Sequence, residues 1–141
     1  MPHFELRPAT VLLIDDEAEI TAGLARCLGA AGYRCQQAAG VAAALDHIDQ
    51  HLPELVICDI NLGGESGLEL CEYLKCLPGM ADVPVMFLSG AQVPDVIRRA
   101  HAAGGVYYLR KPFDPQVLLE LVEKALWMPQ IVAGRTAGVS G

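Results

Sequence analysis

The sequence predicts an α/β domain, a doubly wound five-stranded parallel sheet with five helices. Apolar runs of strand length alternate with segments whose apolar residues recur at helical spacing, as in sheets covered on both faces. Two of these runs, 10–14 and 55–59, are almost continuously apolar and meet acidic residues at their ends. A chain of 141 residues with 52% hydrophobic content is long and apolar enough to bury one core.

The five expected strands differ in polarity. They span residues 10–14, 33–37, 55–59, 84–89 and 106–110. LVICD at 55–59 has β-branched Val56 and Ile57 and no polar side chain before Asp59, so we expect a strand buried on both faces. YRCQQ at 33–37 is more polar, which favours an edge strand.

Helices are expected between the strands. Their predicted spans are 17–31, 41–50, 68–77, 93–103 and 114–128. In the first, Ile20, Leu24 and Leu28 form an apolar stripe. Asp114 and Pro115 combine a capping residue with a proline at the first helical position, a typical helix start. We expect the glycine-rich NLGGESG, residues 61–67, to be a loop.

These elements assign residues 10–128 to a single domain. Residues 1–9 are expected to be an N-terminal extension, and residues 129–141, rich in small residues, a flexible tail or linker. No apolar run approaches the ~20 residues that span a bilayer. MPHFELRPAT lacks the basic start and apolar middle of a signal peptide. We therefore expect a cytoplasmic protein that does not bind membranes.

The composition argues against nucleic-acid binding, disulfide bonds and a histidine metal site. A net charge of −7, with only Arg98 and Arg99 adjacent among the basic residues, argues against direct nucleic-acid binding. The five cysteines include no CxxC pair, so free thiols in a reducing compartment are expected. The four histidines show no metal-ligand spacing.

Polar residues follow four of the five predicted strands. They are Asp15 and Asp16 after the first, Asp59 at the end of the third, Ser89 at the end of the fourth and Lys111 after the fifth. Functional groups of open α/β sheets gather beyond the carboxyl ends of the strands, so we expect these residues to converge. Taken singly, the two adjacent acids could instead cap a helix, Ser89 could belong to a turn, and Lys111 could be a surface charge.

The chemistry of this set favours phosphoryl transfer. Three carboxylates repel one another, and a divalent cation with oxygen ligands, Mg²⁺ above all, relieves that repulsion. Ser89 and Lys111 offer the hydroxyl and ammonium that an anionic phosphoryl group attracts. An aspartate can itself be the nucleophile toward phosphorus, and Asp59 is central in the set, so we assign it that role.

Four segments together carry a family resemblance. They are LLIDDE (12–17), VICDINLGGESG (56–67), VMFLSG (85–90) and YYLRKPF (107–113). In this order and at these separations they resemble the receiver (REC) domain of two-component response regulators, the CheY-like family. The resemblance covers residues 10–128 and implies the flavodoxin-like strand order 2-1-3-4-5.

The resemblance implies a role for each acid. Asp59 would accept a phosphoryl group from a sensor histidine kinase or a histidine phosphotransfer protein. Mg²⁺, with Mn²⁺ as a substitute, would be held by Asp59, directly by Asp16, through water by Asp15, and by the backbone carbonyl of Asn61. Glu17 is expected to begin the first helix and to stay outside the metal's coordination shell.

The resemblance also implies a switch. Ser89 and Lys111 would bind the arriving phosphoryl group, and Tyr108 would rotate inward. Pro112 is a candidate for a cis peptide bond. The surface formed by the fourth helix, fifth strand and fifth helix, roughly Val93 to Trp127, would then change toward an unknown downstream protein or a second copy of the chain.

The sequence departs from the family pattern near the phosphoacceptor. Gly63 replaces a proline that is usual in the family, which predicts a looser loop. Ala91 has no polar group to orient a hydrolytic water, whereas the side chain of Asn61 does. We therefore expect the lifetime of the phosphorylated form to depend on Asn61 more than on Ala91.

The expected function is a phosphorylation-controlled switch in two-component signal transduction. The protein could act through contact with another protein or as an intermediate in a phosphorelay. It is not an enzyme beyond its own phosphorylation and dephosphorylation. The alternatives are a phosphorylation-independent interaction module and the receiver fragment of a larger regulator. An aspartyl phosphatase is disfavoured because Asn61 occupies the position of the second acid, and flavin binding because no hydroxyl-rich loop follows the first strand.

Overall fold

A computed structural model of the chain describes residues 8–90, 94–102 and 105–127. Residues 1–7 of the expected extension, Ala91, and the expected tail at 129–141 lie outside the described residues. Among the described residues, no helix is long and apolar enough to cross a bilayer. All five cysteines are free thiols, as predicted.

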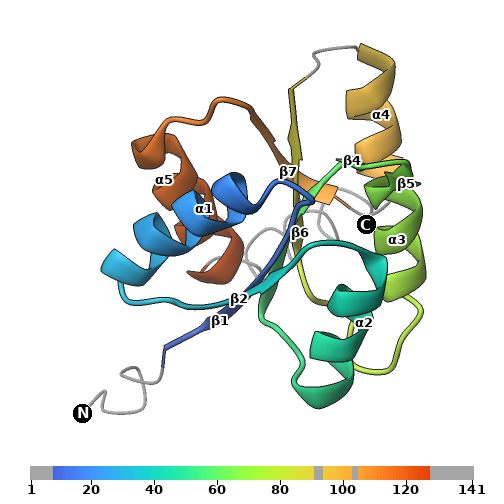
Figure 1. Cartoon of the computed structure of the whole chain (residues 1–141), viewed down its shortest axis with the longest axis horizontal. Helices are drawn as coiled ribbons and strands as arrows, with labels where there is room; N and C mark the ends of the chain where they lie inside the picture. The colour runs from blue at the N-terminus through green and yellow to red at the C-terminus, as the bar shows by residue number, and fades with distance from the viewer. Residues whose placement is uncertain (1–7, 91–93, 103–104, 128–141) are drawn as a thin grey trace, which may run out of the picture.

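The predicted parallel sheet is confirmed (Figure 1). Its strands are β1 (Thr10–Ile14), β2 (Arg34–Ala38), β3 (Leu55–Asp59), β6 (Val85–Ser89) and β7 (Gly105–Arg110). They pair in the order β2-β1-β3-β6-β7, and every pairing is parallel. This is the strand order that the family resemblance implies.

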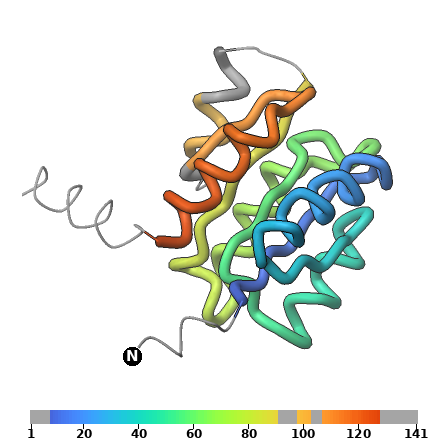
Figure 2. Tube along the Cα trace, turned by 90° about the vertical axis from the view of Figure 1, so that its left-hand side faces the viewer, coloured from blue at the N-terminus to red at the C-terminus, as the bar shows by residue number. Residues whose placement is uncertain are grey.

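The helices form a layer on each face of the sheet (Figures 1 and 2). They are α1 (Ala18–Ala30), α2 (Val41–Gln50), α3 (Gly67–Leu74), α4 (Pro94–Ala102) and α5 (Pro115–Trp127). α1 and α5 cover one face, and α2, α3 and α4 cover the other. Each lies close to its predicted span, although α3 ends before the predicted stop at residue 77.

Alternation along β1 divides the core into two halves. Leu12 and Ile14 pack in the cluster under α2 and α3, whereas Val11 and Leu13 pack in the cluster under α1 and α5. All four side chains have 0% exposure. A strand with both faces buried needs apolar residues at successive positions, which explains the continuous apolar runs.

The glycine-rich segment after β3 was predicted to be a loop, and that prediction is wrong. Residues Asn61–Leu62 (β4) and Glu65–Ser66 (β5) pair as a short antiparallel hairpin. Gly63 and Gly64 connect them with φ of 62° and 104°. Two successive positive φ angles are what the tightest hairpin turns require, so the Gly-Gly pair was the signal for a hairpin.

Candidate functional site

Four strands deliver polar side chains to one edge of the sheet. Asp15 follows β1, Asp59 ends β3, Ser89 ends β6, and Lys111 follows β7. The strands are parallel, so their carboxyl ends lie side by side. Asp15, Asp59 and Ser89 are buried, with exposures of 1%, 6% and 6%. The polar groups therefore lie at the end of the core and are largely withdrawn from solvent.

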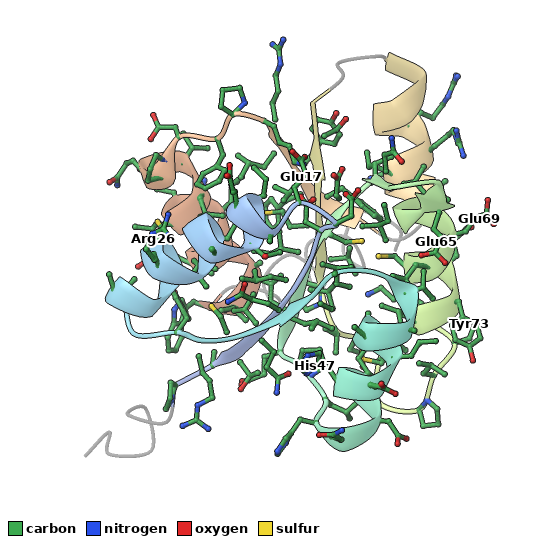
Figure 3. The ribbon with its side chains drawn as sticks, in the orientation of Figure 1. Glu17, Arg26, His47, Glu65, Glu69 and Tyr73 are labelled. Carbon is green, nitrogen blue, oxygen red and sulfur yellow. The ribbon has the colours of Figure 1, made fainter. Side chains whose placement is uncertain are left out.

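Lys111 contacts three acids from two other parts of the chain. Its Nζ lies 2.8 Å from Oδ2 of Asp15, 2.8 Å from Oδ2 of Asp59 and 3.1 Å from Oε1 of Glu17. One oxygen from each of the three carboxylates lies within 4.8 Å of the others. Figure 3 shows Glu17 at the start of α1, at this end of the sheet. Three negative charges thus surround one positive charge.

The pKa values of this cluster reflect burial and pairing together. Burial raises the pKa of Asp15, and the charge of Asp59 raises it further, while the ion pair with Lys111 and the hydrogen bond from the Glu17 amide oppose both effects. Burial alone would lower the pKa of Lys111, but the contacts of its ammonium with the carboxylates of Asp15, Asp59 and Glu17 outweigh burial and raise that pKa. The ammonium is therefore fixed in its charged form, and the cluster keeps an excess of negative charge.

The cluster's donors fit a hard divalent cation. Oδ2 of Asp15 is buried, and its contact with Lys111 is an ion pair without hydrogen-bond geometry. No group among the described residues donates a hydrogen bond to this oxygen. All three candidate ligand atoms are carboxylate oxygens, which Mg²⁺ and Ca²⁺ prefer as ligands. Asp15, Glu17 and Asp59 therefore form a group that could hold a metal ion.

The three acids that follow β1 point in different directions. The carboxylate of Glu17, which the sequence predicts to lie outside the metal's coordination shell, has an oxygen within 4.8 Å of those of Asp15 and Asp59. Asp16 is exposed, and its carboxylate lies beside Gly63, where an added Cβ would be 2.8 Å from Oδ2 of Asp16. The backbone amide of Glu17 donates to Oδ1 of Asp15 at 2.9 Å, a turn that brings these two residues to the same side.

The other predicted site residues lie around this edge. Asn61 is exposed, and its backbone amide donates to Oδ1 of Asp59 at 3.2 Å. Tyr108 is half-buried against the core under α2 and α3, whereas Tyr107 packs against the opposite core, so the two rings lie on opposite faces of the sheet. The peptide bond between Lys111 and Pro112 is cis.

Replacing Lys111 with methionine is expected to tighten Mg²⁺ binding about tenfold. The ammonium lies against the same oxygens that a cation would use, so the two positive charges would repel each other. A tenfold change in affinity corresponds to ~1.4 kcal/mol, and the repulsion between charges this close is several times larger. Isothermal titration calorimetry with MgCl₂ measures the Mg²⁺ affinity of each protein. Lys75→Met is the matched control, because Lys75 is also half-buried but donates to the carbonyls of Ala81 and Val83. Equal affinities in all three proteins would contradict the expectation.

Comparison with known proteins places this fold and site in a class. Residues 11–123 match the response regulator receiver domain family. The chain is 33% identical over 117 residues to the phosphate regulon transcriptional regulatory protein PhoB of Pseudomonas aeruginosa, covering 83% of this chain and 51% of that protein. It is 29% identical to sporulation initiation phosphotransferase F of Bacillus subtilis, covering 82% of this chain and 92% of that protein.

Solved structures agree with the sequence relatives. Chemotaxis protein CheY4 of Vibrio cholerae superposes with a TM-score of 0.81 at 27% identity, covering 84% of this chain and 99% of that one. The receiver domain of NtrX from Brucella abortus gives 0.78 at 30% identity, covering 84% and 98%.

The fold and the acidic strand-end site define a signalling switch of two-component systems. The chain belongs to the response regulator receiver domain family. It spans about half the length of the first curated relatives that it matches.

Proposed function

We propose that this receiver domain accepts a phosphoryl group on Asp59 from a sensor histidine kinase or a histidine phosphotransfer protein, in a reaction that requires Mg²⁺. The observation that supports this most is the placement of Asp59. Its carboxylate is buried at the end of β3, 2.8 Å from the Lys111 ammonium and beside two further carboxylates. Such a site positions an anionic nucleophile next to groups that neutralise incoming phosphate oxygens.

The transfer is a displacement at phosphorus. An oxygen of Asp59 attacks the phosphoryl group of phosphohistidine, an O–P bond forms, and the N–P bond breaks. The imidazole nitrogen keeps the electron pair and takes a proton. Lys111 offsets the charge that gathers on the phosphoryl oxygens. Asp15, Asp16, Asp59 and the carbonyl of Asn61 would hold the Mg²⁺, with Mn²⁺ as a substitute, and the bound cation would neutralise charge during transfer.

The phosphoryl group would act as a switch. It adds about −1.5 to −2 charges and three strong hydrogen-bond acceptors at the strand ends. Ser89 would bind one of its oxygens, Tyr108 would turn inward, and the surface of α4, β7 and α5 would change. This is a two-state element biased by a local charge. The output would be contact with a downstream protein or a phosphorylation-dependent homodimer.

The cytoplasmic location remains a prediction.

A phosphorelay role is a second candidate. The chain covers 92% of sporulation initiation phosphotransferase F, whose name describes a transfer protein. PhoB of Pseudomonas aeruginosa and the transcriptional activator ExaE of Pseudomonas putida are instead about twice the matched length, which favours an attached output. Both candidates begin with phosphorylation at the same residue.

Mg²⁺-dependent phosphorylation by a small phosphodonor tests the proposed function. The protein is incubated with phosphoramidate and MgCl₂, and its intact mass is measured. We expect one added phosphoryl group, and none when EDTA replaces MgCl₂. An unmodified wild type in the presence of Mg²⁺, or equal modification with EDTA, would contradict the proposal.

Asn61→Ala is expected to lengthen the life of the phosphorylated form. The Asn61 side chain is exposed two residues after Asp59 and is suited to orient a hydrolytic water. Removal of this side chain should slow the decay of the phosphorylated form by about tenfold. This is a smaller effect than the loss of a general base would have. Decay is followed by intact mass after the phosphodonor is removed. Ala91→Gly should change the rate less, and unchanged rates in both variants would contradict this expectation.

A further inference from the structure

Glu17 occupies a helix-capping position without capping the helix. It is the residue before α1, with extended backbone angles of φ −91° and ψ 106°, and its side chain accepts no hydrogen bond from the first turn. Residues at this position commonly use a side-chain oxygen to accept from the helix amides. The Glu17 carboxylate instead contacts Nζ of Lys111 at 3.1 Å, which joins residues that are 94 positions apart.

The three acids around Lys111 are not equivalent. The side chains of Asp15 and Asp59 are 0% and 9% exposed, whereas that of Glu17 is 64% exposed. Asp15 and Asp59 are the buried carboxylates that a cation at the strand ends would use. Glu17 is the exposed member of the group, so its oxygen is the one that can stay with Lys111 when the other two bind a cation.

We propose that Glu17 is a positioning residue that retains the Lys111 ammonium when a divalent cation binds Asp15 and Asp59. Glu17 thereby strengthens cation binding, because it removes part of the competition between the cation and the ammonium. The inference rests on the proposed function for the identity of the cation, and it adds to that function a residue that acts through Lys111.

The cost of losing Glu17 follows from the burial of Lys111. The Lys111 side chain is only 13% exposed, so water alone cannot replace its partners. If a cation takes Asp15 and Asp59 in a protein without Glu17, the ammonium keeps no anionic partner among the described residues. A buried charge without a partner is unfavourable, and cation binding must weaken by the same amount.

Titration with MgCl₂ alone, without a phosphodonor, tests the inference on the full chain. Glu17→Gln preserves shape but removes the charge, and we expect Mg²⁺ to bind about tenfold more weakly, as for the loss of one charge-assisted hydrogen bond. Glu17→Asp keeps the charge and should recover part of the affinity. Glu19→Gln is the matched control, because Glu19 lies in the first turn of α1 and the variant has the same net charge. Its affinity should change less than about twofold.

A double-mutant cycle with Lys111→Met separates positioning from bulk charge. If Glu17 acts through Lys111, then Glu17→Gln should weaken Mg²⁺ binding less than about twofold in the Lys111→Met background. An equal tenfold loss in both backgrounds would overturn the inference, as would unchanged affinity of Glu17→Gln in the wild-type background or a wild type that binds no Mg²⁺. The Mg²⁺ affinities could show the expected coupling between Glu17 and Lys111 while the wild type takes no phosphoryl group. That result would leave this inference standing and reject the proposed function.

Discussion

Asp59→Asn is expected to abolish phosphorylation by phosphoramidate. The carboxamide has nearly the shape of the carboxylate, and its oxygen still accepts the hydrogen bond from the Asn61 amide. It is neutral, however, and a poor nucleophile toward phosphorus, so no acyl phosphate forms. The ion pair with Lys111 is lost at the same time. Intact mass after incubation with phosphoramidate and MgCl₂ should show only the unmodified protein.

The control for this variant is Asp49→Asn. Asp49 lies on α2 and is exposed, so the substitution makes the same change in charge without touching the cluster. It should be phosphorylated like the wild type. Persistence of the modification in Asp59→Asn, or its loss in Asp49→Asn, would contradict the assignment of Asp59.

Gly67→Ala is expected to have the largest effect on stability. Gly67 begins α3 and is buried, and its amide donates to the carbonyl of Ile60 at 2.8 Å. A Cβ at this position would lie 1.9 Å from the backbone oxygen of Asp59 and 3.1 Å from Sγ of Cys58. The closest atom belongs to the backbone, so the strand or the helix must move. We expect the free energy of unfolding to fall by more than about 3 kcal/mol.

Chemical denaturation measures this loss, with Gly29→Ala as the control. Gly29 is exposed within α1, and a Cβ there would meet no atom within 4 Å. Alanine is favoured over glycine in helices, so this variant should gain up to about 1 kcal/mol. Equal unfolding free energies for Gly67→Ala and the wild type would show that β3 and α3 are not held as closely as described.

The fold could be predicted largely from the sequence because burial leaves a direct pattern. A strand with both faces covered must be apolar throughout, and the runs at 10–14 and 55–59 show this plainly. The hairpin after β3 was missed because its strands have two residues each, too few for an alternation to appear. Its turn depends on the backbone freedom of Gly63 and Gly64.

The site could be predicted only to the level of strand ends. Parallel strands bring their carboxyl ends together, so the meeting of Asp15, Asp59 and Lys111 follows from their positions in the chain. The directions of Asp16 and Glu17 depend on the turn between β1 and α1, where the Glu17 amide bonds to Asp15. Sequence periodicity carries no information about such a turn. The assignment of individual metal ligands therefore remains a prediction.

Chemical trapping of the phosphoryl group tests the central claim, phosphorylation of Asp59, most directly. The phosphorylated protein is treated with sodium borohydride, which reduces an aspartyl phosphate to homoserine, and the digested peptides are sequenced by mass spectrometry. We expect homoserine at position 59 and at no other position, and none without the phosphodonor. Homoserine at Asp15 or Asp16 instead, or a phosphoryl group that resists reduction and maps to another side chain, would contradict the account.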